Sequence, residues 1–113
     1  MLNQVVLVGR VADDLKITKT EDGKDTMKLL LGVQRCSKNA EGIYETDFIT
    51  CVLWNSIATN VNEYCKKGDI VGIKGRLQTA KVENDDGTFS YKQEVIAEKV
   101  TFLSSKSEKE KEQ

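Results

Sequence analysis

The sequence predicts an all-β fold in which five strands close into one small barrel, with a single short helix between the third and fourth strands. Segments rich in β-branched and apolar residues recur along the chain, and clusters of turn-forming residues that contain glycine separate them. A single stretch, which begins at residue 55, has its apolar residues at helical spacing instead. A chain of 113 residues, 39% of them hydrophobic, is sized for one domain with one core.

The first two expected strands are residues 5–11 (VVLVGRV) and residues 27–33 (MKLLLGV), both rich in side chains that favour strands. The sequence EDGK between them predicts a turn. Glycines inside strands often mark bulges or close backbone contacts, which a barrel needs in order to curl. We therefore expect structural roles for the glycines at positions 9, 32, 72 and 75.

The third expected strand is residues 46–54 (TDFITCVLW), which follows a turn at residues 39–42. Successive side chains of a strand point to opposite faces, so this strand has one apolar face. That face consists of Ile49, Cys51 and Leu53. Phe48 and Trp54 both fall on the other face, so the two aromatic rings are expected on the same side of the sheet.

The expected helix has apolar residues at positions 57, 61, 64 and 65. Asn55 or Ser56 is expected to cap its first turn, and Lys66-Lys67-Gly68 to end it. Residues 70–79 then return to strand, with Lys74, Arg76 and Gln78 on the side opposite the apolar residues. An Asn-Asp-Asp-Gly turn at residues 84–87 leads into a last strand over residues 89–103.

Five strands with a helix between the third and fourth is the order of the OB fold, a partly open Greek-key barrel. The sequence therefore predicts one OB domain over residues 1–103. The polar residues 104–113 (SSKSEKEKEQ) are expected to form a disordered tail.

The composition argues against several classes of function. No histidine is present, the three cysteines form no C-x-x-C pair, and no G-x-x-x-x-G-K-[ST] loop occurs, so we expect no metal, no cofactor and no enzymatic activity. Adjacent aspartates at 13–14 and 85–86 point apart and are interpreted as solvated loop residues. No secretion signal or long apolar run is found, which predicts a cytoplasmic protein whose cysteines are free thiols.

The formal net charge of −1 means that any basic groove has to be local. A protein that binds single strands without sequence preference needs cations along a groove and aromatic rings on which bases stack. Phe48 and Trp54 supply rings on one face, and Lys74 and Arg76 supply cations on the next strand. The alternative interpretation is that the rings belong to the core and the cations to a solvated strand face.

Three segments of the chain are distinctive: MLNQVVLVGRV at residues 1–11, TDFITCVLWNSIATNVNEYCKKGDIVGIKGRLQT at residues 46–79 and YKQEVIAEKVTFL at residues 91–103. With these segments the chain resembles the bacterial and phage single-stranded DNA-binding proteins, in particular the type of Gram-positive bacteria and their phages. The resemblance implies an OB fold that binds single strands in replication, recombination and repair. It also implies assembly as a homotetramer, with a dimer as the alternative.

By position, the resemblance assigns base stacking to Phe48 and Trp54. It places polar and basic binding positions at Arg10, Arg35, Lys74, Arg76 and Gln78, and it makes Tyr91 a further stacking platform or a barrel residue.

The chain also departs from the family pattern. Val82 replaces an aromatic residue, and Gln4 stands where many relatives have a cation. The acidic tip ending in Pro-Phe is missing, which puts recruitment of repair enzymes through that tip in doubt.

Two rival functions stay open at this point. One is an OB adaptor for replication or recombination proteins, in which strand binding is incidental. The other is an RNA-binding OB domain, because base stacking does not read the 2′-hydroxyl.

Overall fold

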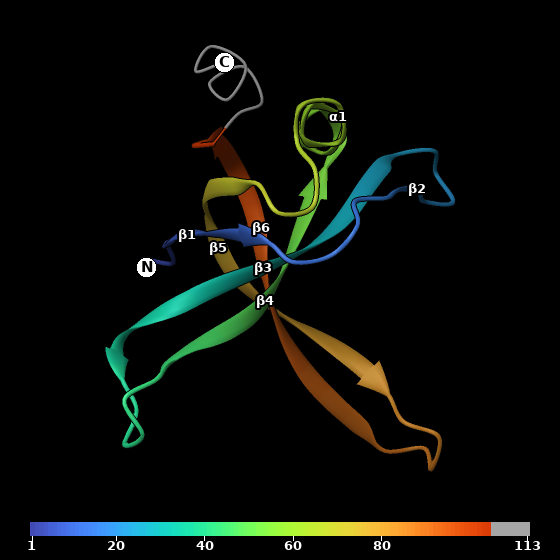
Figure 1. Ribbon diagram of the computed structural model, residues 1–113. Coiled ribbons are helices and arrows are strands. Elements are labelled where there is room, and N and C mark those ends of the chain that lie inside the picture. Colours follow the sequence, from blue (N-terminus) through green and yellow to red (C-terminus); the bar gives the residue numbers. More distant parts are fainter. Residues whose placement is uncertain (105–113) are drawn as a thin grey trace.

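The computed structural model describes residues 1–104, and these form a barrel from which two hairpins project (Figure 1). The elements in chain order are β1 (Val5–Val11), β2 (Ile17–Lys19), β3 (Asp25–Lys38), β4 (Tyr44–Trp54), α1 (Asn55–Tyr64), β5 (Ile70–Glu83) and β6 (Phe89–Phe102). Of the tail expected at residues 104–113, residues 105–113 lie outside the described part of the chain.

The strand order confirms the OB prediction. The sheet runs β1-β5-β6-β4-β3-β2, and β1 also pairs with β3, so that β1, β5, β6, β4 and β3 close a barrel. Neighbouring strands are antiparallel except β4 and β6, which are parallel. β2 is an addition to the expected five strands: it pairs with β3 over only three residues, too few to show an alternating pattern in the sequence.

The core lies inside the barrel and consists of alternate residues of the strands. Its fully buried members include Met27, Leu29, Leu31, Cys51, Leu53, Val71 and Ile73. Burial of Cys51 and Leu53 confirms the face assigned to β4 from its alternation. Desolvation raises the pKa of both the Cys51 and the Cys65 thiol to about 11, so these two thiols are protonated at neutral pH.

The helix α1 packs Ala58 and Val61 against the barrel. The expected side-chain cap on Asn55 or Ser56 is wrong, because Trp54 is the N-cap residue and no side chain bonds to the first turn. Asn55 has a positive φ of 54°, which bends the chain sharply from β4 into α1.

Two glycines allow the barrel to close. A Cβ atom on Gly9 would overlap the carbonyl oxygen of Gly32, where β1 approaches β3, and a Cβ atom on Gly75 would overlap the carbonyl oxygen of Ile96. Gly75 also lies at the register shift between β5 and β6. The structural roles expected for these positions are confirmed.

Two arms extend beyond the barrel and diverge in Figure 1. The β3–β4 arm comprises residues 33–47, and the β5–β6 arm comprises residues 79–93. Each turns through a three-residue loop that ends in a glycine with positive φ, Gly42 at 79° and Gly87 at 85°. The turns predicted at residues 39–42 and 84–87 are thereby confirmed.

Candidate nucleic-acid interface

The outer face of β4 carries both aromatic rings. Phe48 is 64% exposed and Trp54 is 37% exposed, whereas Cys51 and Leu53 on the inner face are fully buried. The two rings lie at opposite ends of the outer face of β4, separated by Thr50 and Val52. The strand therefore presents flat apolar surface to solvent at two points that are six residues apart.

A groove runs beside the Phe48 ring. Arg10 on β1 lies opposite Gly32 on β3, and Gly32 lies opposite Phe48 on β4. Because the middle position has no side chain, the surface is hollowed between the guanidinium and the ring, with a volume of about 540 Å³. Its lining also includes Val8, Gln34, Thr46 and Ile70. An apolar floor, one ring and one cation can hold a flat base together with its phosphate.

The Arg10 side chain is held in place by the backbone. Its Nη1 donates a hydrogen bond to the Gly68 carbonyl oxygen at 2.7 Å, across the turn that follows α1. A carbonyl acceptor orients the guanidinium without cancelling its charge, so Arg10 keeps a full positive charge at the groove.

A second row of side chains crosses the outer face between the two rings. Lys28 on β3 lies opposite Val52, Val52 lies beside Ile96 on β6, and Ile96 lies opposite Arg76 on β5. The row therefore has an apolar centre with a cation at each end. Lys28 was not among the residues predicted from the sequence, although its position between the core residues Met27 and Leu29 places it on the outer face.

Arg76 and Gln78 are joined, since Nη1 of Arg76 donates to Oε1 of Gln78 at 2.6 Å. Lys74 continues the same face of β5 and lies opposite Lys99 on β6. Among the described residues, no ion pair involves Lys28, Lys74 or Arg76. The charge of this surface is thus available to an anionic ligand.

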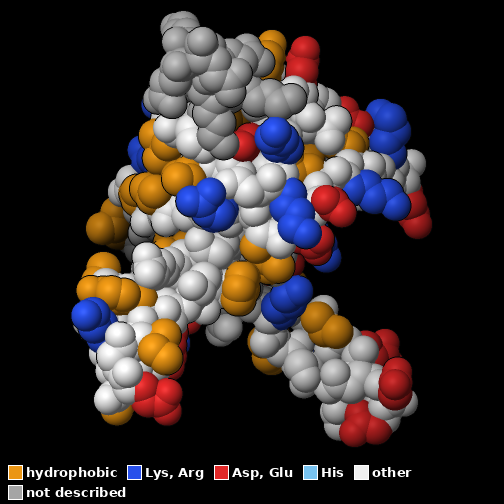
Figure 2. Space-filling view, in the orientation of Figure 1, with side chains coloured by type: hydrophobic (Ala, Val, Ile, Leu, Met, Phe, Trp, Pro, Cys, Tyr) orange, Lys and Arg blue, Asp and Glu red, His pale blue; other side chains and the backbone are white. Residues whose placement is uncertain are grey.

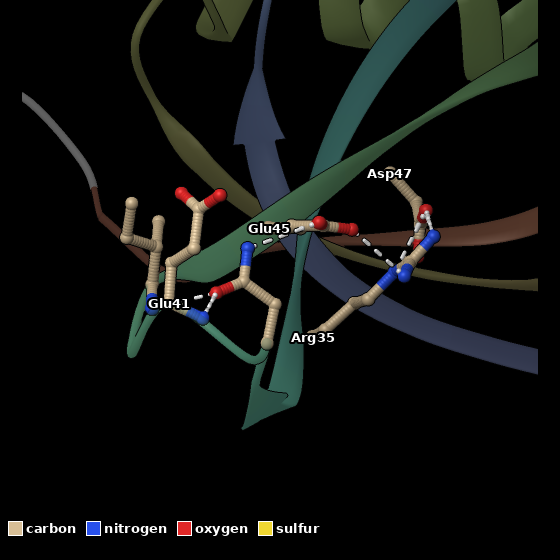
Figure 3. A network of polar contacts seen from close by, with 6 residues as sticks. Arg35, Glu41, Glu45 and Asp47 are labelled. Carbon is tan, nitrogen blue, oxygen red and sulfur yellow. Dashed lines mark hydrogen bonds and ion pairs between the residues drawn. The ribbon is translucent and has the colours of Figure 1, made fainter.

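Arg35 is placed differently from the other predicted cations. It lies on the β3–β4 arm, where its guanidinium forms ion pairs with Asp47 at 2.9 Å and with Glu45 at 2.9 Å (Figure 3). Hydrogen bonding to Arg35 lowers the pKa of the Asp47 carboxyl and raises that of the guanidinium. Asn39 donates to Glu45 from the turn, so this network connects the tip of the arm to its base.

Tyr91 also lies apart from the other predicted residues. It stands on the β5–β6 arm opposite Lys81, on the face that continues the inner side of the barrel. The structure therefore brings Phe48, Trp54, Arg76 and Gln78 onto one outer face and leaves Tyr91 on the reverse face of an arm.

The two arms are the more acidic part of the described chain. Figure 2 shows side chains of both signs over the barrel body, and Asp and Glu side chains at the ends of both arms. The acidic arm residues are Glu41, Glu45, Asp47, Glu83, Asp85 and Asp86. The body is therefore more basic than the total of −1 suggests, as a local binding groove requires.

Comparison with known protein families identifies the family of the chain. The sequence model described as the Single-strand binding protein family matches residues 2–103. The chain belongs to that family.

The names of individual proteins similar to the chain agree with this family. The chain is 42% identical over 106 residues to Single-stranded DNA-binding protein B of Bacillus subtilis (strain 168), and the match covers 94% of each chain. It is 45% identical over 103 residues to a Single-stranded DNA-binding protein of Bacillus cereus, and 40% identical over 113 residues to Single-stranded DNA-binding protein 1 of Staphylococcus aureus (strain Mu50). The matches cover 91% and 100% of this chain, but only 61% and 72% of those longer relatives.

Family membership confirms the expected resemblance and the expectation that the chain is not an enzyme. Within residues 1–104 no cluster of three or more histidine, cysteine or acidic side chains could hold a metal ion. No helix in that same part of the chain is long and apolar enough to cross a membrane.

Proposed function

We propose that this chain binds and protects single-stranded DNA, with little sequence preference, during DNA replication, recombination and repair. The observation that carries this proposal is the outer face of the barrel, where two exposed rings share one surface with several cations that have no ion-pair partner in the described part of the chain. The matched relatives are named as single-stranded DNA-binding proteins, which supports the same ligand for this chain.

The chemistry of the outer face explains why binding should depend little on the base sequence of the strand. Base stacking on an aromatic ring contributes about 1–3 kcal/mol per base and does not distinguish bases strongly, since every base has a flat π face. Lys and Arg contacts to phosphates add affinity that depends on salt and carries no sequence information.

Each site residue has a role in the proposal. Phe48 and Trp54 stack bases, Arg10 holds a phosphate at the groove, and the cations of the outer face follow the backbone of the strand. Those cations are Lys28, Lys74 and Arg76, with Gln78 as a neutral neighbour. Arg35 stays a prediction as a phosphate contact, because a strand would have to displace Glu45 and Asp47 from it.

Removing both rings tests the site. The Phe48→Ala, Trp54→Ala double variant should lose affinity for fluorescein-labelled oligo-dT, by about 2–6 kcal/mol if each ring stacks one base. Tyr64→Ala is the matched control, because Tyr64 is 64% exposed like Phe48 but lies on α1.

Full affinity in the double variant would contradict the site. Binding lost equally in the control would contradict the assignment to β4. Competition with a matched RNA strand distinguishes DNA from RNA as the ligand. Absence of any complex would favour the protein-adaptor function.

The proposal extends to assembly and location. We infer a homotetramer, with a dimer as the alternative, in the cytoplasm of a bacterium or a phage-infected cell. The outer face of β1 exposes apolar side chains: Val6 is 68% exposed, and Val8 is also exposed. Such a strand buries its surface when copies associate. Light scattering should therefore give a molecular mass that is a multiple of 12.7 kDa, and the Val6→Lys substitution should lower that mass.

A further inference from the structure

Glu94 on β6 places a carboxylate on the outer face, where the other charged groups are cations. Its neighbour Val95 is buried in the core, so alternation along the strand turns Glu94 to the outer side, together with Ile96. Glu94 lies opposite Gln78 on β5. At the outer-face positions of β3, β4 and β5, no other Asp or Glu occurs. A negative charge on this face therefore needs an explanation.

Glu94 lies beside the part of β4 that separates the two rings. β4 and β6 run parallel, and extending their pairing by one residue makes Thr50 the neighbour of Glu94. On the outer face, Thr50 lies between Phe48 and Trp54. Paired strands are only about 5 Å apart. A strand whose bases stack on both rings therefore passes within reach of the Glu94 carboxylate.

The Glu94 carboxylate has no partner within residues 1–104. The side chain is only 9% exposed, and it forms neither an ion pair nor a side-chain hydrogen bond there. Arg76, on the same face, instead donates to Gln78 at 2.6 Å. Every fully buried side-chain oxygen or nitrogen in this part of the chain has a partner, so the Glu94 oxygens reach the surface.

This combination points to a ligand that brings N–H donors. A carboxylate that has lost most of its contact with water is unfavourable unless a donor or a cation compensates it. The phosphates of a strand cannot do so, because they are anions. The amino groups of bases can, and in a single strand the Watson–Crick edges that carry them are free.

The bases differ in what they offer to a carboxylate. Cytosine, adenine and guanine each carry an exocyclic amino group, and acceptance from the cytosine amino group is an established pairing of Asp and Glu. Thymine has a carbonyl oxygen where cytosine has the amino group. That oxygen is an acceptor and repels a carboxylate.

We propose that Glu94 reads one base of a bound strand: its carboxylate accepts a hydrogen bond from an exocyclic amino group, and so favours cytosine, adenine or guanine over thymine at that position. The inference rests on the proposed function and deepens it. Stacking and phosphate contacts stay indifferent to sequence, so the preference is confined to one base of the bound strand. The hydrogen bond involves no phosphate, so the preference should be the same at low and at high salt.

Two oligonucleotides that differ in the amino group test the proposal in the full chain. Oligo-dC and oligo-dU of about 8 nucleotides are within the range of about 4–16 that one OB fold covers, and their rings have the same size. Glu94→Gln should lower the ratio of dC affinity to dU affinity about tenfold, because a hydrogen bond to a charged group is lost and an amide can pair with either base. Glu63→Gln removes the same charge from an exposed position on α1 and should keep the parent ratio.

A modified base tests the same hydrogen bond without a protein variant. Oligo-N4,N4-dimethyl-dC has no N–H on the amino group, and the parent chain should bind it about tenfold more weakly than oligo-dC. In Glu94→Gln this difference should become smaller. Equal affinity of the parent chain for the two strands would overturn the proposal.

The variant has two further outcomes that would overturn it. One is the same dC-to-dU ratio in Glu94→Gln and in the parent chain. The other is a parent-like ratio together with a lower molecular mass in light scattering, which would assign Glu94 to contacts between copies.

The base preference and the proposed function fail in different ways. If the base preference alone is wrong, oligo-dC and oligo-dU both quench Trp54, and Glu94→Gln leaves their ratio unchanged. If the proposed function is wrong, neither strand quenches Trp54 in the parent chain.

Discussion

Cross-strand register brings the cations Lys28 and Arg76 into one row on the outer face. They are far apart in sequence, yet they lie at the two ends of one row whose centre is Val52 and Ile96. Neither has an ion-pair partner among residues 1–104. We infer that each neutralises about one phosphate.

Removing these charges should change the salt dependence more than the specificity. Lys28→Gln and Arg76→Gln should each reduce the salt slope for single-stranded DNA by about 0.7. Affinity for different base compositions should fall evenly, since phosphates carry no sequence information. Lys19→Gln is the control, because Lys19 is already paired with Asp25 at 2.9 Å. Titrations at several salt concentrations measure the slope, and an unchanged slope in both variants would place the strand elsewhere.

Asp47 gives a prediction about pH at the same scale. Its pKa is lowered, first by the hydrogen bond from Arg35 and then by the charge of Arg35. A depressed carboxyl pKa stabilises the folded state above the unfolded pKa, and that stabilisation is lost as pH falls through the folded value. The Arg35 network should therefore hold at neutral pH and come apart only below about pH 4.

Carboxyl NMR titration of Asp47 checks this. Arg35→Gln should raise the pKa of Asp47 towards its ordinary value of 3.8. Asp22, which is lowered by its hydrogen bond from Thr20, should keep its pKa in that variant. A parent-like pKa of Asp47 in the variant would show that the ion pair does not form in solution.

At the scale of elements, β5 and β6 depend on the close approach at Gly75. Gly75→Ala would force a Cβ atom against the Ile96 carbonyl, and overpacking of this kind costs typically 1–3 kcal/mol. Gly72→Ala is the matched control on the same strand, since its Cβ atom would meet nothing closer than 3.5 Å. Urea unfolding of both variants measures the difference, and equal stability would show that the strands adjust freely around the bulge.

Elements could be predicted from the sequence wherever a pattern is long. The alternation of residues 46–54 predicted both the core face of β4 and the side of Phe48 and Trp54. The arms were underestimated on β3, β4 and β5, which extend beyond the expected residues 27–33, 46–54 and 70–79, because the added residues are mostly polar and show no clear alternation. Leu77 lies on the apolar side of β5 as expected, but it is exposed because the core ends at its level.

The predicted site residues also divide into those that the pattern of one strand places and those that depend on the pairing of two strands. Phe48, Trp54, Arg76 and Gln78 fell on one face because parity along a strand is local information. The same local parity places Lys28 on the outer face, but its row with Arg76 and the ion pairs of Arg35 depend on which residues of neighbouring strands lie opposite each other. Register is set by turns and bulges that a single strand does not reveal.

At the scale of the whole molecule, a net charge of −1 is compatible with an anionic ligand, because Lys28, Lys74 and Arg76 lie on one face and form no ion pair within the described residues. The tips of both arms are acidic, so an anionic strand should be attracted to the cations of the outer face and repelled by the tips. Binding is therefore expected to be strongly salt-sensitive despite the neutral total.

The most direct test is the fluorescence of Trp54, the only tryptophan of the chain, during titration with poly-dT at low and then at high salt. The account predicts strong quenching at low salt that weakens or reverses as salt is added. An unchanged spectrum, together with a gel shift that shows no complex, would contradict the claim that the outer face of β4 stacks single-stranded DNA.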